Sequence, residues 1–345
     1  MTGTENNRAQ VGRPAALPET DVMSMITSLD RSELLHAIDE AVNAPETANR
    51  PVPFVSVIVP VYNDFAGLRR CLEALEAQTY ASGCYEVVVV DNGSTHPIVE
   101  LVDAFPHAVP EFEAQPGSYA ARNRGVAAAR GEILAFTDAD CTPASTWLAE
   151  GVAALEADSE CGFVAGDIQV VARDARAPTA VEFYELTYGF RQAFYVTEGF
   201  GATANLFTRR DVFDAVGGFD ARLKSCGDRE WGMRARDAGY RLAYSDAARV
   251  LHPARRTWGE LIKKTARVSG GMFELSRMHG HGRRHTLAVV LSELRPPIRQ
   301  ALLVLNGEGP PSLRGRLSVI AALTLRRCVT ALEWLRLEAG SSPSR

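Results

Sequence analysis

The sequence predicts an α/β fold built around a sheet of mainly parallel strands. Two nearly continuous apolar runs, 54–60 and 85–90, are rich in valine and isoleucine, as is typical of strands buried on both faces of a parallel sheet. A segment with helical spacing, 65–78, lies between them, and a further helix and strand follow at 118–130 and 132–137. Strand and helix patterns that alternate in this way indicate βαβ units. Polar clusters stand directly after the strands, where sheets of this kind bind ligands.

The alternation of helix and strand continues toward the C-terminus. A helix is expected at 145–157 and a strand at 162–171, on the same grounds of periodicity. Two longer helical stretches are expected at about 286–305 and 313–338.

The N-terminal segment looks different from this body. Residues 1–20 are polar and proline-rich, which predicts a disordered tail, and apolar residues at helical spacing in 21–42 predict a short amphipathic helix. No secretory signal is visible. No apolar window reaches the roughly 18–20 residues of a membrane span; the longest candidate, 317–325, is much shorter. These features predict a cytoplasmic protein.

The composition excludes some classes of function. With 46% hydrophobic residues, 23% charged residues and a net charge of −5, the chain resembles an ordinary globular enzyme and not a protein that coats nucleic-acid phosphates. The cysteines are scattered, without a CxxC pair, which predicts reduced thiols. They are Cys71, Cys84, Cys141, Cys161, Cys226 and Cys328.

Three polar clusters follow predicted strands, at 60–63, 91–94 and 138–140. Because ligands bind outside the carboxyl ends of the strands in such sheets, the clusters should converge on one crevice. Asp138 and Asp140 are two residues apart, so both carboxylates can reach one divalent cation, Mg²⁺ or Mn²⁺, which would also bind substrate phosphate. Such a cation neutralises the charge on a departing diphosphate.

The clusters belong to a longer series of motifs. In chain order these are Pro60-Val-Tyr-Asn63, Val90-Asp-Asn-Gly-Ser94, Ala121-Arg-Asn-Arg-Gly125 with Ala129-Arg-Gly131, Thr137-Asp-Ala-Asp140, Val216-Gly-Gly-Phe-Asp220 and Gly227-Asp-Arg-Glu-Trp231. The series resembles that of the family 2 glycosyltransferases, which are inverting enzymes with the GT-A fold, a Rossmann-like mixed sheet flanked by helices. The resemblance spans roughly residues 54–270.

The resemblance implies a binding site for a nucleotide-sugar donor, with UDP favoured because it is the family's commonest donor nucleotide. Asp91 would contact the nucleoside, and the 60–63 loop would line its pocket. Asp138 and Asp140 would hold the diphosphate and a divalent metal, Mn²⁺ or Mg²⁺. The donor-binding candidates are Pro60, Val61, Tyr62, Asn63, Asp91, Asn123, Asp138 and Ala139.

Asp228 matches the family's catalytic base. The family often carries glutamate before this aspartate, whereas this chain has Gly227. An inverting displacement requires a carboxylate that accepts the proton of the attacking hydroxyl. An aspartate at the start of a helix is also a common N-cap, so the residues alone leave both roles open.

Further candidates lie on the acceptor side. Glu230 is expected to orient the acceptor, and Trp231 and Asn205 complete the acceptor candidates, with Asn205 in a wall at 201–205. His252 lies where many GT-A enzymes place a further metal or phosphate ligand. A lone histidine is also often structural, and both roles remain open.

Three segments allow two interpretations each. The aromatic residues of 183–200 belong to the core or border the acceptor site. The basic tract 279–285 closes over the diphosphate or forms a plain solvated loop. The arginine-rich C-terminal helices pack on their own domain or lie on an anionic membrane surface, as peripheral contacts at the inner face.

These expectations give a domain plan and a function. The plan has a tail and helix at 1–50, a GT-A catalytic domain divided into a nucleotide-sugar half (51–140) and an acceptor half (141–270), and a helical appendage at 271–345. The expected reaction is a single, metal-dependent, inverting sugar transfer to an acceptor hydroxyl.

Two other functions are alternatives to sugar transfer. A sugar-phosphate nucleotidyltransferase would be expected to carry a glycine-rich basic loop after the first strand, where this chain has Val61-Tyr-Asn-Asp64. A GT-A-like protein that only binds sugars or partners would be expected to have lost an acidic residue of the motifs, and none is lost.

Overall fold

The computed structural model describes residues 51–308 and 310–343. The chain separates into an N-terminal unit, Met1–Pro51, and a second unit, Val52–Arg345, which holds every described residue except Pro51. The tail and helix expected within residues 1–50 lie outside the described residues. Within the described residues, no helix combines the length and apolar character needed to cross a membrane.

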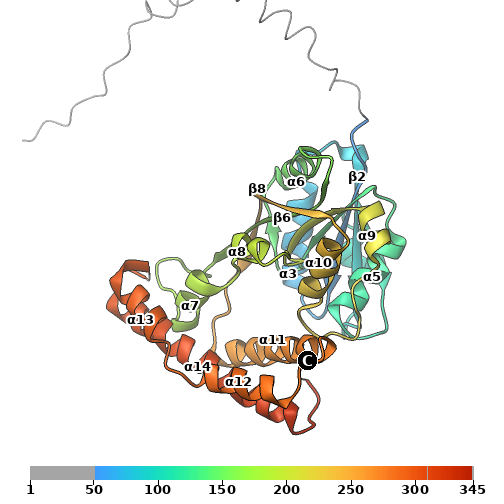
Figure 1. Ribbon diagram of the computed structural model, residues 1–345. Helices are drawn as coiled ribbons and strands as arrows, with labels where there is room; N and C mark the ends of the chain where they lie inside the picture. The colour runs from blue at the N-terminus through green and yellow to red at the C-terminus, as the bar shows by residue number, and fades with distance from the viewer. Residues whose placement is uncertain (1–50, 309, 344–345) are drawn as a thin grey trace, which may run out of the picture. The chain divides into compact units, whose positions relative to one another are not determined.

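The second unit is built on one mixed, eight-stranded sheet (Figure 1). In sheet order its strands are β3 (Ala108–Phe112), β2 (Tyr85–Asp91), β1 (Val55–Val61), β4 (Ile133–Thr137), β7 (Asn205–Arg209), β6 (Cys161–Val171), β8 (Arg241–Pro253) and β5 (Thr142–Pro143). Strands β3, β2, β1 and β4 are parallel to one another. The β7 strand runs antiparallel to β4 and β6, β6 runs parallel to β8, and β5 runs antiparallel to β8. The expected mixed α/β fold is confirmed.

Helices cover both faces of the sheet and extend beyond it. They are α3 (Phe65–Glu76), α4 (Val99–Val102), α5 (Ser118–Ala128), α6 (Trp147–Glu156), α7 (Ala180–Tyr188), α8 (Gln192–Thr197), α9 (Arg210–Val216), α10 (Gly227–Asp237), α11 (Trp258–Met278), α12 (Arg283–Glu293), α13 (Ile298–Leu303) and α14 (Leu313–Glu338), with short turns at Ser82–Cys84 and Val304–Glu308.

Strand β1 shows why its sequence reads as one apolar run. Val57 and Val59 belong to the core layer formed with α3 and α6, whereas Ile58 belongs to the opposite layer, formed with α5 and α10. All three side chains are fully buried. Because successive side chains of a strand point to opposite faces, burial on both faces requires an apolar residue at every position.

The C-terminal helices form a separate layer. Helix α14 packs against α7, α11 and α12, and Ser269 of α11 donates a hydrogen bond to Thr330 of α14. The expected boundary after residue 270 lies inside α11 (Trp258–Met278). The division into a catalytic domain and a helical appendage stays a prediction.

One predicted helix is wrong. The stretch 286–305 is interrupted after α12, and α13 begins only at Ile298. Pro296 and Pro297 cause the break, because proline lacks the backbone N–H of a helix interior and disfavours helical backbone at the residue before it. The helix expected at 313–338 is confirmed as α14.

Candidate active site

A cavity of about 1400 Å³ opens at the carboxyl ends of β1 and β4 and extends to α11 and α14. Eight predicted site residues line it: Pro60, Val61, Tyr62, Asp138, Ala139, Asp140, Asp228 and His252. The strand ends therefore gather the donor, metal and base candidates around one space, as the sequence predicts.

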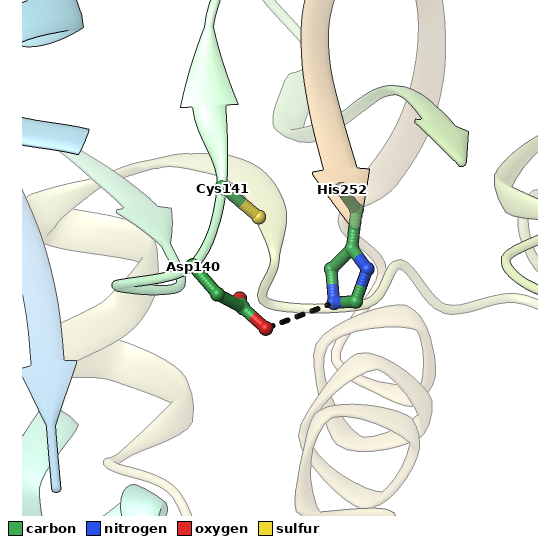
Figure 2. A group of neighbouring side chains, drawn as sticks. All are labelled: Asp140, Cys141 and His252. Carbon is green, nitrogen blue, oxygen red and sulfur yellow. Dashed lines mark ion pairs between the residues drawn. The ribbon is translucent and has the colours of Figure 1, made fainter. Parts of the chain in front are cut away.

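Asp140 and His252 form the centre of a possible metal site (Figure 2). Strand β5 pairs with β8 so that Thr142 lies opposite Leu251, and this pairing brings the residues just outside it together. The Asp140 Oδ2 atom is 3.6 Å from His252 Nε2. Two residues 112 positions apart are thus brought together by a two-residue strand.

The hydrogen bond of His252 defines which ring nitrogen faces Asp140. Nδ1 lies 2.9 Å from the carbonyl oxygen of Pro253, and because a carbonyl oxygen only accepts, Nδ1 must carry the proton. In the neutral ring, Nε2 then directs its lone pair toward the Asp140 carboxylate. Two electron-rich atoms facing each other suit a cation between them, and metal-binding histidines typically donate their other ring N–H to a carbonyl oxygen in this way.

Cys141 is the third member of the cluster, whose possible ligand atoms all lie within 4.8 Å of one another. Its thiol is fully buried and donates weakly to the carbonyl oxygen of Ala204 at 3.9 Å. Burial and the carboxylates of Asp138 and Asp140 raise the pKa of the Cys141 thiol well above its ordinary range. A thiol that stays protonated is a poor metal ligand, so Asp140 and His252 are the stronger ligand candidates of this cluster.

Asp138 has a protein partner that was not predicted from the sequence. It forms an ion pair with the guanidinium of Arg122, a side chain that is only 4% exposed. The Nε atom of Arg122 is buried and has no hydrogen-bond partner among the described residues. Burial, aided by the charge of Asp138, raises the pKa of the Asp140 carboxyl, although the nearby His252 opposes this effect.

Asp228 lies in the first turn of α10 and faces the same cavity. It is not the N-cap, because that position is Cys226, in a left-handed conformation with φ of 62°. The Asp228 Oδ1 atom accepts hydrogen bonds from the backbone N–H of Arg229 at 2.9 Å and from the hydroxyl of Tyr119 at 3.2 Å. Burial raises the pKa of this carboxyl above its ordinary range.

Gly227 is explained by its contact with Tyr119. A Cβ atom at position 227 would lie 2.7 Å from the Tyr119 ring, closer than real Cβ atoms approach other atoms. The glycine therefore leaves room for the aromatic ring whose hydroxyl bonds Asp228. The departure from the family's usual glutamate has a local steric reason.

Helix α5 joins the two sides of the cavity. Tyr119 and Arg122 are one turn apart on this helix, and the Arg122 guanidinium lies 5.6 Å from the Tyr119 ring centroid. Tyr119 donates a hydrogen bond to Asp228, and Arg122 forms an ion pair with Asp138. The sequence predicts the helix and the motif Ala121–Gly125, which contains Arg122, but neither of these two contacts was predicted from it.

Two acceptor candidates are wrong. The Asn205 side chain is fully buried, accepts a hydrogen bond from Trp147 Nε1 and donates to the carbonyl oxygens of Asp167 and Ala248. Trp231 is also fully buried, and its Nε1 donates to the carbonyl oxygen of Gly217 at 2.9 Å. Both side chains hold the fold together and cannot contact an acceptor.

Four other candidates do not line the cavity. Asn123 binds both the N–H and the C=O of Phe219 and so fixes that loop. Glu230 pairs with Arg234. Asp91 accepts the backbone N–H of Ser94, and Asn63 accepts that of Thr95. The last two lie at the paired ends of β1 and β2, beside the cavity residues Val61 and Asn92.

The cavity is also lined by a group of charged side chains that the sequence did not indicate. Lys264 of α11 lies 3.2 Å from the buried carboxylate of Glu185, which also pairs with Arg255 at 3.0 Å. Burial lowers the pKa of Lys264 to about 8. No local pattern could reveal this group, because its members are brought together from α7 and α11.

The structure shows where two segments with open interpretations lie. Five aromatic residues of 183–200 line the cavity, so they border it even where they also pack: Tyr184, Tyr188, Phe190, Tyr195 and Phe200. The tract 279–285 is not one loop, because α12 begins at Arg283. His279, His281 and His285 line the far end of the cavity, and the rings of His281 and His285 stack at 4.3 Å.

The comparisons with known proteins identify the family of the chain. The model of "Glycosyl transferase family 2" matches residues 56–217. Glycosyltransferase AglE of Haloferax volcanii is 38% identical over 246 residues, which are 70% of this chain and 80% of that protein. The pre-mycofactocin glycosyltransferase of Mycobacterium tuberculosis is 30% identical over 293 residues, which are 81% of this chain but only 58% of that longer relative.

A solved structure shares the fold. It is a mannosyltransferase from Pyrobaculum calidifontis in complex with GDP-Man and Mn²⁺, with a TM-score of 0.51 and 20% identity over 90% of this chain and 83% of that one. At this identity the likeness concerns the fold alone. The match to the family model and the identity to AglE show that the chain is a glycosyltransferase of family 2.

Proposed function

We propose that this enzyme transfers a sugar from a nucleotide diphosphate sugar to an acceptor hydroxyl, with inversion and with the help of a divalent metal. One observation carries the proposal: a single turn of α5 places Arg122 on Asp138 and Tyr119 on Asp228 in one cavity. The side chains that would act as base and as anion-binding group therefore face the same space. Sugar transfer needs both.

The donor would lie at the β1 and β4 end of the cavity. Pro60, Val61 and Tyr62 line this end, and the Tyr62 ring is 64% exposed, so it can pack against a nucleobase. Asp91 and Asn63 at the neighbouring strand end would contact the nucleoside. We favour UDP as the nucleotide, on the family resemblance.

Asp140 and His252 would hold the metal, with Asp138 beside them. Carboxylate oxygen and imidazole nitrogen suit Mn²⁺, and carboxylate with phosphate oxygen suits Mg²⁺. When bound, the cation would neutralise charge on the departing diphosphate. The Arg122 guanidinium, held on Asp138, would add positive charge on the same side.

Asp228 would act as the general base. Its carboxylate would accept the proton of the acceptor hydroxyl while that oxygen bonds the anomeric carbon and the bond to the diphosphate breaks on the opposite face. A carboxyl whose pKa is raised by burial is better matched to proton transfer near neutral pH than an ordinary aspartate. Tyr119 would hold the carboxylate in position.

The acceptor would occupy the part of the cavity bordered by aromatic residues. Tyr195 and Phe200 stack with ring centroids 5.0 Å apart and line the cavity, and aromatic faces pack well against sugar rings. Thr203, in the predicted wall 201–205, also lines it. The cytoplasmic location that the sequence predicts is part of this proposal, as is single addition.

The stereochemistry of slow donor hydrolysis tests the proposal without a known acceptor. The enzyme would be incubated with α-linked UDP-, GDP- and dTDP-sugars and Mn²⁺, with water as acceptor, and the released sugar followed by proton NMR. We expect one nucleotide to be used, a β-configured sugar as the first product, and no product with Asp228→Asn. An α-configured first product, or hydrolysis unchanged by a metal chelator, would contradict the proposal.

A further inference from the structure

Helix α14 exposes an apolar stripe along its whole length. Leu313, Leu317, Leu332 and Leu335 are 67%, 55%, 66% and 43% exposed. The exposed residues between them on this stripe are uncharged: Ala321, Thr324 and Cys328. The seven positions follow the 4-4-3 spacing of one helix face. The opposite side of α14 is also apolar but buried, with Val319, Ala322 and Trp334.

Helices α12 and α13 repeat this feature. Leu287, Leu291 and Leu294 lie on one face of α12 and its end and are 55%, 63% and 59% exposed, and Ile298 and Leu302 of α13 are 63% and 53% exposed. Helix α12 runs antiparallel to α14, since Thr286 bonds Glu338 and Glu293 pairs with Arg326. Figure 1 shows these three helices at the edge of the molecule away from the sheet.

The same helices are strongly basic in an acidic chain. Residues 283–338 contain nine arginines and four acidic residues, a net charge of +5, whereas the whole chain carries −5. Four of these arginines are exposed and have no carboxylate partner among the described residues: Arg284, Arg295, Arg299 and Arg314. Exposed leucines bordered by unpaired arginines match an anionic lipid interface.

We propose that this C-terminal leucine face binds the surface of an anionic membrane. It comprises Leu287, Leu291, Leu294, Ile298, Leu302, Leu313, Leu317, Leu332 and Leu335, with the four unpaired arginines. The leucines would enter the acyl boundary and the arginines would contact lipid phosphates. The proposal goes beyond sugar transfer, because lipid binding by this face does not depend on the chemistry of the cavity.

The alternatives fit the surface less well. A second copy of the chain would bring the same positive charge against itself in a symmetric contact. Residues 1–50 carry four basic and eight acidic residues, so they match in charge. The one short amphipathic helix that the sequence predicts there would cover one stripe and not the apolar side chains of three helices. Contiguous apolar surfaces of this kind are rarely left to water.

The consequence for the enzyme concerns access to the acceptor. Val289 of α12 and Leu323 and Trp334 of α14 line the far end of the cavity. Docking of these helices would therefore hold that end near the membrane surface, where acceptors attached to lipid are presented.

Flotation of the full chain with vesicles tests the proposal. Vesicles of phosphatidylcholine alone would be compared with vesicles of phosphatidylcholine and phosphatidylglycerol in equal amounts. We expect binding to the mixed vesicles only. Leu317→Asp with Leu332→Asp should lower the affinity about tenfold or more per leucine. Arg295→Gln with Arg299→Gln should lower it about fivefold per arginine.

Matched control variants change the same chemistry elsewhere. Val99→Asp replaces a side chain that is 46% exposed on α4, and Arg69→Gln with Arg70→Gln removes two exposed arginines of α3. Both should bind vesicles like the wild type. Donor hydrolysis in solution, measured on every variant, should be unchanged, which separates failure of this inference from failure of the proposed function.

Several results would overturn the proposal: no binding to mixed vesicles, equal binding to both vesicle types, or equal loss in the control variants. Sedimentation showing a dimer that Leu317→Asp dissociates would assign the face to a second copy. Hydrogen exchange showing that Leu317→Asp with Leu332→Asp deprotects residues 21–42 without vesicles would assign it to the N-terminal segment.

Discussion

The sheet and the C-terminal helices differ in how far their apolar side chains are exposed to solvent. In β1, Val57, Ile58 and Val59 are all fully buried, whereas Leu317 and Leu332 of α14 are more than half exposed. The sheet also gathers charged side chains into one cavity at its strand ends. The burial of the sheet residues is explained by the fold itself, while the exposed leucines of α14 are explained by the membrane contact that we propose. The two proposals thus assign sugar transfer to the sheet region and membrane binding to the C-terminal helices.

The largest expected effect separates the two regions by activity. Asp228→Asn should lower transfer or donor hydrolysis by about 10²–10⁴-fold, because it removes the proton acceptor. Vesicle binding should remain unchanged. If Asp228→Asn keeps more than a tenth of the wild-type activity, Asp228 is not the general base.

The same substitution has a predicted effect on stability. The pKa of Asp228 is raised in the folded protein, chiefly by burial, so its charged form opposes folding as the pH rises through that pKa. At neutral pH Asp228→Asn should therefore be more heat-stable than the wild type, by calorimetry. A lower midpoint would show that loss of activity reflects damage to the fold.

The metal cluster gives the next effect. Asp140→Asn and His252→Ala should each lower activity with Mn²⁺ by about 100-fold or more, since metal stabilisation contributes several kcal/mol. Cys141→Ser should retain activity, because its protonated thiol is not expected to bind the metal. Equal losses at all three positions would indicate a different ligand set.

A stability comparison sharpens the contrast between regions. Leu148 on α6 is fully buried, so Leu148→Ala should lower the free energy of unfolding by about 2–5 kcal/mol. Leu332→Ala on α14 should change it by less than about 0.5 kcal/mol, because the side chain already meets water. Urea unfolding of both variants measures this, and similar losses would mean that the leucine face is covered within the chain.

The smallest effect concerns pH. Activity should fall as the pH drops through the raised pKa of Asp228, because the base must be ionised. The Tyr119 hydroxyl stabilises the ionised form by a hydrogen bond, so Tyr119→Phe should move this acid limb to higher pH. The pH profile of kcat/KM measures the shift. An acid limb that does not move would show that Tyr119 does not stabilise the ionised Asp228 carboxylate.

Local sequence signals located most of the sheet region. Strands β1, β2 and β4 are runs of apolar residues, and the polar clusters after them needed only the rule that ligands bind at strand ends. Strand β3 was missed because it is a half-buried edge strand without a clear apolar pattern. A pattern of apolar residues reveals a strand only where its side chains are buried, and few side chains of an edge strand are buried.

The remaining errors come from contacts between distant residues. Trp231 and Asn205 lie in motifs next to the site, but only the folded structure shows that both side chains point into the core. The pairing of Lys264 with Glu185 joins residues 79 positions apart. For α14, the sequence predicted the helix and left its packing open, and only the structure shows which of its two apolar sides is covered.

The measurement that tests the central claim most directly is nucleotide diphosphate binding by thermal shift, with and without Mn²⁺, on wild type, Asp140→Asn and Asp228→Asn. Ligands that bind the folded state raise the midpoint. The account predicts a metal-dependent shift for one nucleotide that is lost in Asp140→Asn and kept in Asp228→Asn, since one residue holds the donor side and the other acts on the acceptor. If both variants lose the shift alike, or the shift needs no metal, the division of the cavity into a metal side and a base side is wrong.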